Sequence, residues 1–280
     1  MEYLERRVAL VEDELESVIG DVEPDELSDE LAHVVLAGGK RVRPAGRARA
    51  GGGLDGDPDD AVDVAAGMEC VPNASCVRDD SSDRSDVRRG TPSAWAEFGY
   101  GPAILTSDGL LGEAFALFSS HDRAMRTVAE AMVELGEGEA TELAARPSTE
   151  AEYMRLARRK TGALFRAAAE LGALAGGAEP AAIDAFGEYA ERVGVAFQMR
   201  DDVLDATADA ADLGKPTGQD AEMDRPSVVQ VTSLTPAEVD ERAREQSELA
   251  LAALEQADPP ETEALAYLRD LAEFVVVRER

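Results

Sequence analysis

One stretch decides how this 280-residue sequence is interpreted: FQMRDDVLD, at residues 197–205. It places Asp201 and Asp205 four residues apart, and side chains with this spacing lie on one face of a helix. Two carboxylates on one helix face repel each other by roughly 0.2–0.5 kcal/mol, a cost that a bound cation removes. The stretch therefore predicts a helix that carries part of a cation site.

The same pattern occurs earlier as DDSSD at residues 79–83, where Asp79 and Asp83 have the same spacing. Two such clusters on facing helices would supply oxygen ligands for Mg²⁺, with substrate phosphates and waters completing its octahedron. A third copy, at residues 59–63, has no basic residues close after it, and we interpret it as a solvated acidic helix start. The surroundings of a cluster therefore indicate which copies bind metal.

Basic motifs provide those surroundings. Five basic residues lie in short motifs beside the clusters or near the N-terminus: Lys40, Arg43, Arg88, Arg89 and Lys215. Adjacent arginines offer forked donors for diphosphate oxygens, and a lysine on a glycine-containing loop can close over phosphate. The basic turn GGKRVRP, at residues 38–44, indicates an anion site in an acidic protein, with a basic helix C-cap as the alternative.

Helical periodicity dominates the chain. Apolar residues recur at helix spacing over residues 2–18, 103–118, 123–136, 150–175, 180–204, 236–256 and 261–278. No alternating strand pattern is bounded by turns, and loops are expected at residues 51–58, 90–92 and 206–226. We therefore predict an all-α fold in a single domain, residues 1–280.

Composition restricts the partners and the setting. The chain has 58 acidic and 28 basic residues and a net charge of -30, which repels nucleic acid and anionic lipid. At roughly 1 M salt the Debye length is about 3 Å and most of this self-repulsion is screened, so we interpret the charge as adaptation to a salty cytoplasm. A charged N-terminus, two cysteines and no apolar run of about 20 residues predict a cytoplasmic protein without an integral membrane segment.

Taken in order, five motifs resemble those of the trans-prenyl diphosphate synthases (polyprenyl synthetases): GGKRVRP, DDSSD with RRG, KTGALF at residues 160–165, FQMRDDVLD, and GKPTGQD at residues 214–220. The resemblance extends from about residue 30 to the C-terminus. It implies a bundle of long helices around a central cavity, of the isoprenoid synthase type, paired as a homodimer. The implied activity is Mg²⁺-dependent condensation of isopentenyl diphosphate with an allylic prenyl diphosphate.

The resemblance also implies roles for individual residues. Four aspartates would hold Mg²⁺: Asp79, Asp83, Asp201 and Asp205. Arg88 and Lys215 would bind the allylic diphosphate, and isopentenyl diphosphate would be bound by Lys40, Arg43 and Arg89. The site where positive charge develops would be lined by Lys160, Thr161 and Gln198. Neutral dipoles stabilise a carbocation without trapping it, and no catalytic histidine is expected.

The sequence departs from the family pattern near the first cluster. Pro72 and Arg78 stand where the family usually has histidines, which affects isopentenyl diphosphate binding more than metal binding. Bulky residues four or five positions before the cluster shorten the product in this family, whereas here they are Ser75 and Ala74. We therefore expect a product of about twenty carbons or longer, like that of a geranylgeranyl diphosphate synthase.

Two other functions stay open. A terpene cyclase on the same fold would ionise the diphosphate without condensing it, and Pro72 slightly favours this alternative. A non-catalytic partner subunit of an active synthase is the second alternative, and the complete aspartate clusters argue against it.

Overall fold

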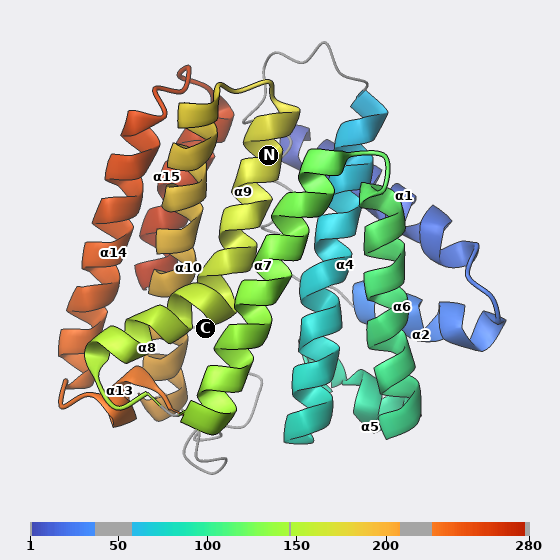
Figure 1. Cartoon of the computed structure of the whole chain (residues 1–280), viewed down its shortest axis with the longest axis horizontal. Helices are drawn as coiled ribbons and strands as arrows, with labels where there is room; N and C mark the ends of the chain where they lie inside the picture. Colours follow the sequence, from blue (N-terminus) through green and yellow to red (C-terminus); the bar gives the residue numbers. More distant parts are fainter. Residues whose placement is uncertain (1, 37–57, 146, 208–225, 278–280) are drawn as a thin grey trace. The chain divides into compact units, whose positions relative to one another are not determined.

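The computed structural model describes residues 2–36, 58–145, 147–207 and 226–277, which are almost entirely helical (Figure 1). Contacts divide the chain into two compact units, the first formed by residues 1–48 and 54–125 and the second by residues 49–53 and 126–280. None of the described helices is long and apolar enough to span a membrane. The all-α prediction is confirmed, whereas the single domain and its central cavity stay predictions.

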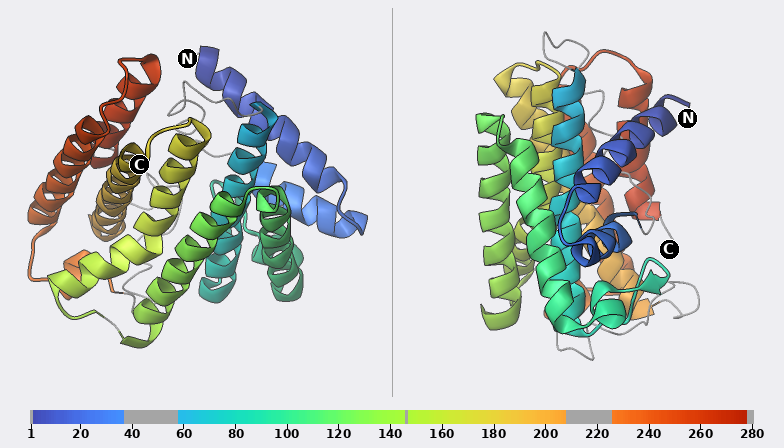
Figure 2. Two further views of the ribbon diagram at one scale, coloured as in Figure 1. Left: turned by 45° about the horizontal axis from the view of Figure 1, so that its top comes forward. Right: turned by 90° about the vertical axis from the view of Figure 1, so that its right-hand side faces the viewer.

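The first unit contains α1 (Glu2–Gly20), α2 (Asp25–Leu36), α4 (Pro58–Asp83), the strands β1 (Val87–Arg88) and β2 (Thr91–Pro92), α5 (Ala94–Phe98) and α6 (Tyr100–Phe118). Helix α4 packs along α6 and also contacts α1, α2 and α5 (Figures 1 and 2). Its residues 64–75 are buried without interruption. A helix that is buried on all sides has no amphipathic period, which explains why periodicity did not predict it.

Two details hold α4 in place. A Cβ on Gly67 would lie 2.8 Å from the ring of Phe118, so only glycine lets the end of α6 approach this closely. Pro72 lies inside the helix, where proline costs about 3 kcal/mol because it lacks an N–H donor. In the same turn, Asn73 Nδ2 donates to the carbonyl of Glu69 at 2.8 Å. The helix continues through Pro72 in spite of this cost.

The second unit contains most of α7 (Asp122–Ala140), followed by η1 (Thr141–Ala145), α8 (Glu150–Ala157), η2 (Arg158–Gly162), α9 (Ala163–Ala175), α10 (Pro180–Thr207), α13 (Val228–Val231), α14 (Pro236–Gln256) and α15 (Glu263–Val277). Helix α10 packs against α9, α14, α15 and η2 (Figures 1 and 2). It contributes to both apolar clusters of this unit, one shared with α14 and α15 and one shared with α8 and α13. Helix α10 therefore forms the centre of the unit.

The predicted helices are found close to their expected bounds. Residues 150–175 form one continuous helical stretch in which η2 is a π-helical turn. The third aspartate cluster lies in the first turns of α4, as the interpretation of a helix start requires. The sequence did not predict the hairpin β1–β2, which pairs Val87 with Pro92 and Arg88 with Thr91. Strands of two residues are too short to show an alternating pattern.

Candidate functional site

The first aspartate cluster forms the C-terminal end of α4. Asp79 and Asp83 are half-buried, whereas Asp80 is only 3% exposed. Arg84 adopts a positive φ of 52°, and the Ser85 amide donates to the Asp80 carbonyl at 3.0 Å, which ends the helix in a Schellman-type cap. The chain then turns directly into the β1–β2 hairpin.

The hairpin brings its first strand back to the end of α4. Its two loop residues, Arg89 and Gly90, have φ values of 55° and 81°, the positive pair that a type I′ turn requires. The Ser93 amide donates to the Asp86 carbonyl at 2.9 Å, and His33 Nε2 donates to the Pro92 carbonyl at 2.9 Å. His33 therefore helps to hold the second strand of the hairpin against α2.

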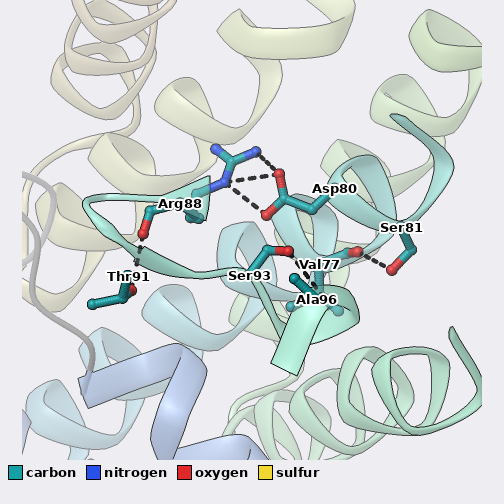
Figure 3. A network of polar contacts seen from close by, with 7 residues as sticks. All are labelled: Val77, Asp80, Ser81, Arg88, Thr91, Ser93 and Ala96. Carbon is teal, nitrogen blue, oxygen red and sulfur yellow. Dashed lines mark hydrogen bonds and ion pairs between the residues drawn. The ribbon is translucent and has the colours of Figure 1, made fainter. Parts of the chain in front are cut away.

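Arg88 of β1 pairs with Asp80 (Figure 3). Its Nε donates to both carboxylate oxygens, at 3.1 and 2.8 Å, and its Nη2 donates to Oδ1. Burial acts to lower the pKa of Arg88, but Cys76, Asp80 and Asp79 more than offset this effect, and the pKa is raised above its usual value. The side chain of Arg88 stays 42% exposed, so a guanidinium held by Asp80 still has a surface for a ligand.

A small cavity of about 30 Å³ lies beside this ion pair and has room for about one water molecule. Arg88 and Arg89 both line it, together with Asn73 and Cys76 from α4. The structure therefore brings the two arginines, which the resemblance assigns to different diphosphates, to one place in the first unit. Asn73 is a polar neighbour that no spacing rule identified.

The second aspartate cluster lies near the end of α10. Asp201 is half-buried, Asp205 is buried, and Asp202 is 3% exposed. Asp202 Oδ2 accepts hydrogen bonds from Tyr153 Oη and from the Val228 amide, both at 2.7 Å. Its Oδ1 accepts one from Gln198 Nε2 at 2.8 Å. These three hydrogen bonds to the middle aspartate all come from neutral donors.

Thr161 and Gln198, predicted to act together, are in direct contact: Thr161 Oγ1 donates to Gln198 Oε1 at 2.8 Å. Two glycines permit this approach, because a Cβ on Gly194 of α10 would lie 3.1 Å from the Cα of Gly162 in η2. The π-helical turn η2 also carries Lys160, and such turns occur frequently at functional sites.

Lys160 has an acidic partner that the sequence did not predict. Its Nζ donates to Glu142 Oε2 of η1 at 2.6 Å, and the two side chains are only 18% and 11% exposed. A Cβ on Gly138 would lie 2.8 Å from the Lys160 amide nitrogen, so glycine permits the close packing behind this pair. Residues 142 and 160 belong to no common motif, and only packing brings them together.

Three predicted residues lie outside the described part of the chain: Lys40, Arg43 and Lys215. Their roles in diphosphate binding stay predictions.

The aspartate clusters fit a hard cation that shares its ligands with a substrate. In each cluster the middle carboxylate accepts hydrogen bonds from protein donors, and the outer pair has the spacing predicted for metal ligands. Among the described residues, no group of three or more His, Cys, Asp or Glu side chains forms a closed metal site. Mg²⁺ binds through one or two carboxylates and keeps waters and substrate phosphates, so the donor set fits it.

Comparison with known proteins gives the same assignment. The family model for polyprenyl synthetase matches residues 24–268. The short chain isoprenyl diphosphate synthase of Methanothermobacter thermautotrophicus is 34% identical over 253 residues, which cover 87% of this chain and 78% of that protein. The geranylgeranyl diphosphate synthase of Methanosarcina mazei is 33% identical over 230 residues, which cover 79% of this chain and 71% of that protein.

A solved structure agrees in fold. The polyprenyl synthase from Caulobacter crescentus, crystallised with calcium and isoprenyl diphosphate, aligns with a TM-score of 0.89 and 26% identity, covering 100% of this chain and 97% of that one. The all-α structure, the two aspartate clusters and these similarities lead to one conclusion. The chain belongs to the polyprenyl synthetase family and is a trans-prenyltransferase with the isoprenoid synthase fold.

Proposed function

We propose that the protein is a Mg²⁺-dependent synthase that condenses isopentenyl diphosphate with an allylic prenyl diphosphate to a product of about twenty carbons or longer. The observation that carries this proposal is the arrangement in the second unit. A pair of outer aspartates and the hydrogen-bonded pair Thr161–Gln198 lie on or beside one helix, α10. This arrangement supports metal binding and cation stabilisation at neighbouring positions.

Four carboxylates would hold the metal: Asp79, Asp83, Asp201 and Asp205. Mg²⁺ held there would supply positive charge to neutralise the departing diphosphate, which would make cleavage of the allylic carbon–oxygen bond feasible. The calcium and isoprenyl diphosphate in the Caulobacter crescentus relative support divalent metal use at such a site. Arg88, which Asp80 holds at one edge, would present its exposed edge to diphosphate oxygens.

Thr161 and Gln198 would face the carbocation that remains after the diphosphate departs. Their oxygen dipoles stabilise positive charge without forming a covalent bond to it, as a carboxylate in contact would. Lys160, the third residue assigned to the cation site, donates to Glu142, whose carboxylate compensates its charge. The double bond of isopentenyl diphosphate would then attack the cation and form the new carbon–carbon bond, and the released diphosphate would accept the proton that the resulting cation loses.

The product length rests on two supports. The two residues four and five positions before the first cluster, Ser75 and Ala74, are small and buried in α4. The relative from Methanosarcina mazei is named a geranylgeranyl diphosphate synthase, whose product has about twenty carbons.

We further propose that the single domain forms a homodimer in a salt-rich cytoplasm. Helix α6 exposes four large apolar side chains, Tyr100, Ile104, Leu105 and Phe115, and carries only two charged residues, Asp108 and Glu113. An exposed apolar surface on a chain of net charge -30 indicates a contact with another protein surface. Light scattering of the wild type and of Leu105→Glu at high salt tests this proposal: a dimer that the variant converts to a monomer is the expected result.

One incubation tests the activity. The purified protein is given Mg²⁺, high salt, labelled isopentenyl diphosphate and allylic diphosphates of several lengths, with Asp79→Ala as the inactive control. Longer prenyl diphosphates are the expected products, and chains of only ten or fifteen carbons would contradict the proposed length. A hydrocarbon or alcohol from the allylic substrate alone would indicate a cyclase, and absence of turnover would indicate a partner subunit.

A further inference from the structure

A chain of hydrogen bonds runs behind the proposed cation site. Thr161 donates to Gln198 Oε1, Gln198 Nε2 donates to Asp202 Oδ1, and Tyr153 donates to Asp202 Oδ2. We propose that Asp202 is a positioning residue rather than a metal ligand, and that with Tyr153 it fixes which atoms Gln198 and Thr161 present to the developing cation. This inference rests on the proposed function of Thr161 and Gln198.

The direction of the hydrogen bonds follows from the acceptor-only character of a carboxylate. Because ionised Asp202 can only accept, Gln198 must turn its NH₂ group toward it. The amide oxygen of Gln198 then faces Thr161, whose hydroxyl must donate its single proton to that oxygen. The remaining lone pairs of Thr161 Oγ1 are left for a ligand, which suits a positively charged group.

The carboxylate of Asp202 is enclosed by protein donors. It is 3% exposed and accepts three hydrogen bonds, from Gln198, from the Val228 amide and from Tyr153, which is itself 2% exposed. Three of its roughly four lone-pair positions are therefore occupied by protein donors, which leaves little capacity for a metal ion.

The charge of Asp202 acts through Gln198 rather than by contact with the substrate. A buried chain of hydrogen bonds polarises its members, so the carboxylate increases the negative character of the Gln198 oxygen. If Asp202 lost its charge, the Gln198 amide would be free to rotate and to direct its NH₂ group at Thr161. The hydroxyl would then turn its proton outward, and the site would repel positive charge.

Four variants test this inference. Asp202→Asn removes the charge and keeps the size, Tyr153→Phe removes one donor, and Asp201→Asn changes the adjacent proposed metal ligand. Asp240→Asn is the matched control, because Asp240 forms its ion pair with Arg200 of α10, at 2.8 Å, rather than with Gln198 or Asp202. The measurements are kcat and KM for both substrates, and Mg²⁺-dependent binding of inorganic diphosphate by calorimetry.

Asp202→Asn is expected to lower kcat about 10- to 100-fold, which is the usual cost of removing a residue that orients a reactive group. Its KM values and its diphosphate affinity should stay within about twofold of those of the wild type. Asp201→Asn should lose Mg²⁺-dependent diphosphate binding, Tyr153→Phe should lower kcat by a smaller factor, and Asp240→Asn should change neither. Loss of diphosphate binding in Asp202→Asn, or an unchanged kcat, would overturn the inference. If Asp202→Asn does not fold, Tyr153→Phe provides the test instead, and an unchanged kcat in that variant would overturn the inference.

The proposed condensation activity can be refuted independently of the role proposed for Asp202. If the wild type makes no longer prenyl chain, condensation is refuted. The binding comparison between Asp201→Asn and Asp202→Asn still tests whether Asp202 binds the metal, because it requires no turnover.

Discussion

The two aspartate clusters have the same spacing but different surroundings. In the first, the middle carboxylate of Asp80 is bound by the guanidinium of Arg88. In the second, the middle carboxylate of Asp202 is bound by a phenol, a backbone amide and a side-chain amide, all neutral. The two clusters therefore differ in the partners of their middle aspartate.

This difference suits the two kinds of charge that the reaction presents. A guanidinium fixed at one edge attracts a diphosphate, so a cationic partner is useful beside the first cluster. A carbocation would be repelled by a cationic partner, whereas oriented neutral dipoles stabilise it. Lys160, next to Thr161, is itself paired with Glu142, which compensates its charge. The surroundings of Asp202 therefore fit the cation better than those of Asp80 would.

The largest expected effect concerns the outer aspartates, which both clusters have at the same spacing. Asp79→Asn and Asp201→Asn should each lower kcat/KM about a thousandfold or more, since metal stabilisation is worth several kcal/mol and each 1.4 kcal/mol is about tenfold. Steady-state kinetics over a range of Mg²⁺ concentrations measure this loss. A loss below about tenfold for either variant would show that the two outer pairs are not equivalent.

Glu142→Gln tests whether Lys160 needs its carboxylate. Both side chains are largely buried, so the variant leaves an ammonium group with a weaker partner, and we expect unfolding free energy to fall by about 1–3 kcal/mol. Chemical denaturation measures the change. Glu139→Gln is the control on the same part of the chain, and equal losses in both variants would argue against a specific pair.

Asp80→Asn tests the partner in the first cluster. The variant keeps the size but loses the charge that aligns Arg88, and we expect KM for the allylic diphosphate to rise about tenfold with a smaller change in kcat. This is the opposite of the change expected for Asp202→Asn. Two variants with the same kinetic signature would remove the functional distinction between the clusters.

A smaller effect is expected from salt, which should weaken the Asp80–Arg88 interaction more than the Asp202–Tyr153 interaction. The Asp80–Arg88 pair is partly exposed, and such pairs contribute roughly 0.2–1 kcal/mol that salt screens. The Asp202–Tyr153 bond is buried and has one neutral partner, so its contribution should change little. Double-mutant cycles at low and high salt measure both couplings, and an Asp80–Arg88 coupling that salt leaves unchanged would contradict the assignment.

The smallest expected effect concerns the thiol of Cys70, whose reactivity should be equally low in the wild type and in Asp80→Asn. Burial raises the pKa of Cys70 on α4 to about 12, with further contributions from Glu69 and Glu113. Because the thiolate is the reactive form, Cys70 should not react with an alkylating reagent at pH 8 unless α4 opens. Mass spectrometry after alkylation should find Cys70 protected in the wild type and in Asp80→Asn. Labelling in the variant alone would show that its kinetic change comes from a disturbed helix.

Local rules determined much of the fold from the sequence. Amphipathic helices such as α14 were predicted because one face is apolar and the other is solvated. Helix α4 was not, because residues 64–75 are buried on every side and leave no period to detect. Helices α5 and α13, of 5 and 4 residues, are too short for periodicity to identify.

The sequence by itself also determined the outer aspartates, because a spacing of four residues places two side chains on one helix face wherever that helix lies. Only the tertiary structure decided what the middle aspartates bind. Arg88 returns to Asp80 because the chain reverses at Arg84, and Tyr153 reaches Asp202 across 49 positions of sequence because α8 and α10 pack together. No local rule connects Tyr153 with Asp202, since their contact depends on the packing of two separate helices.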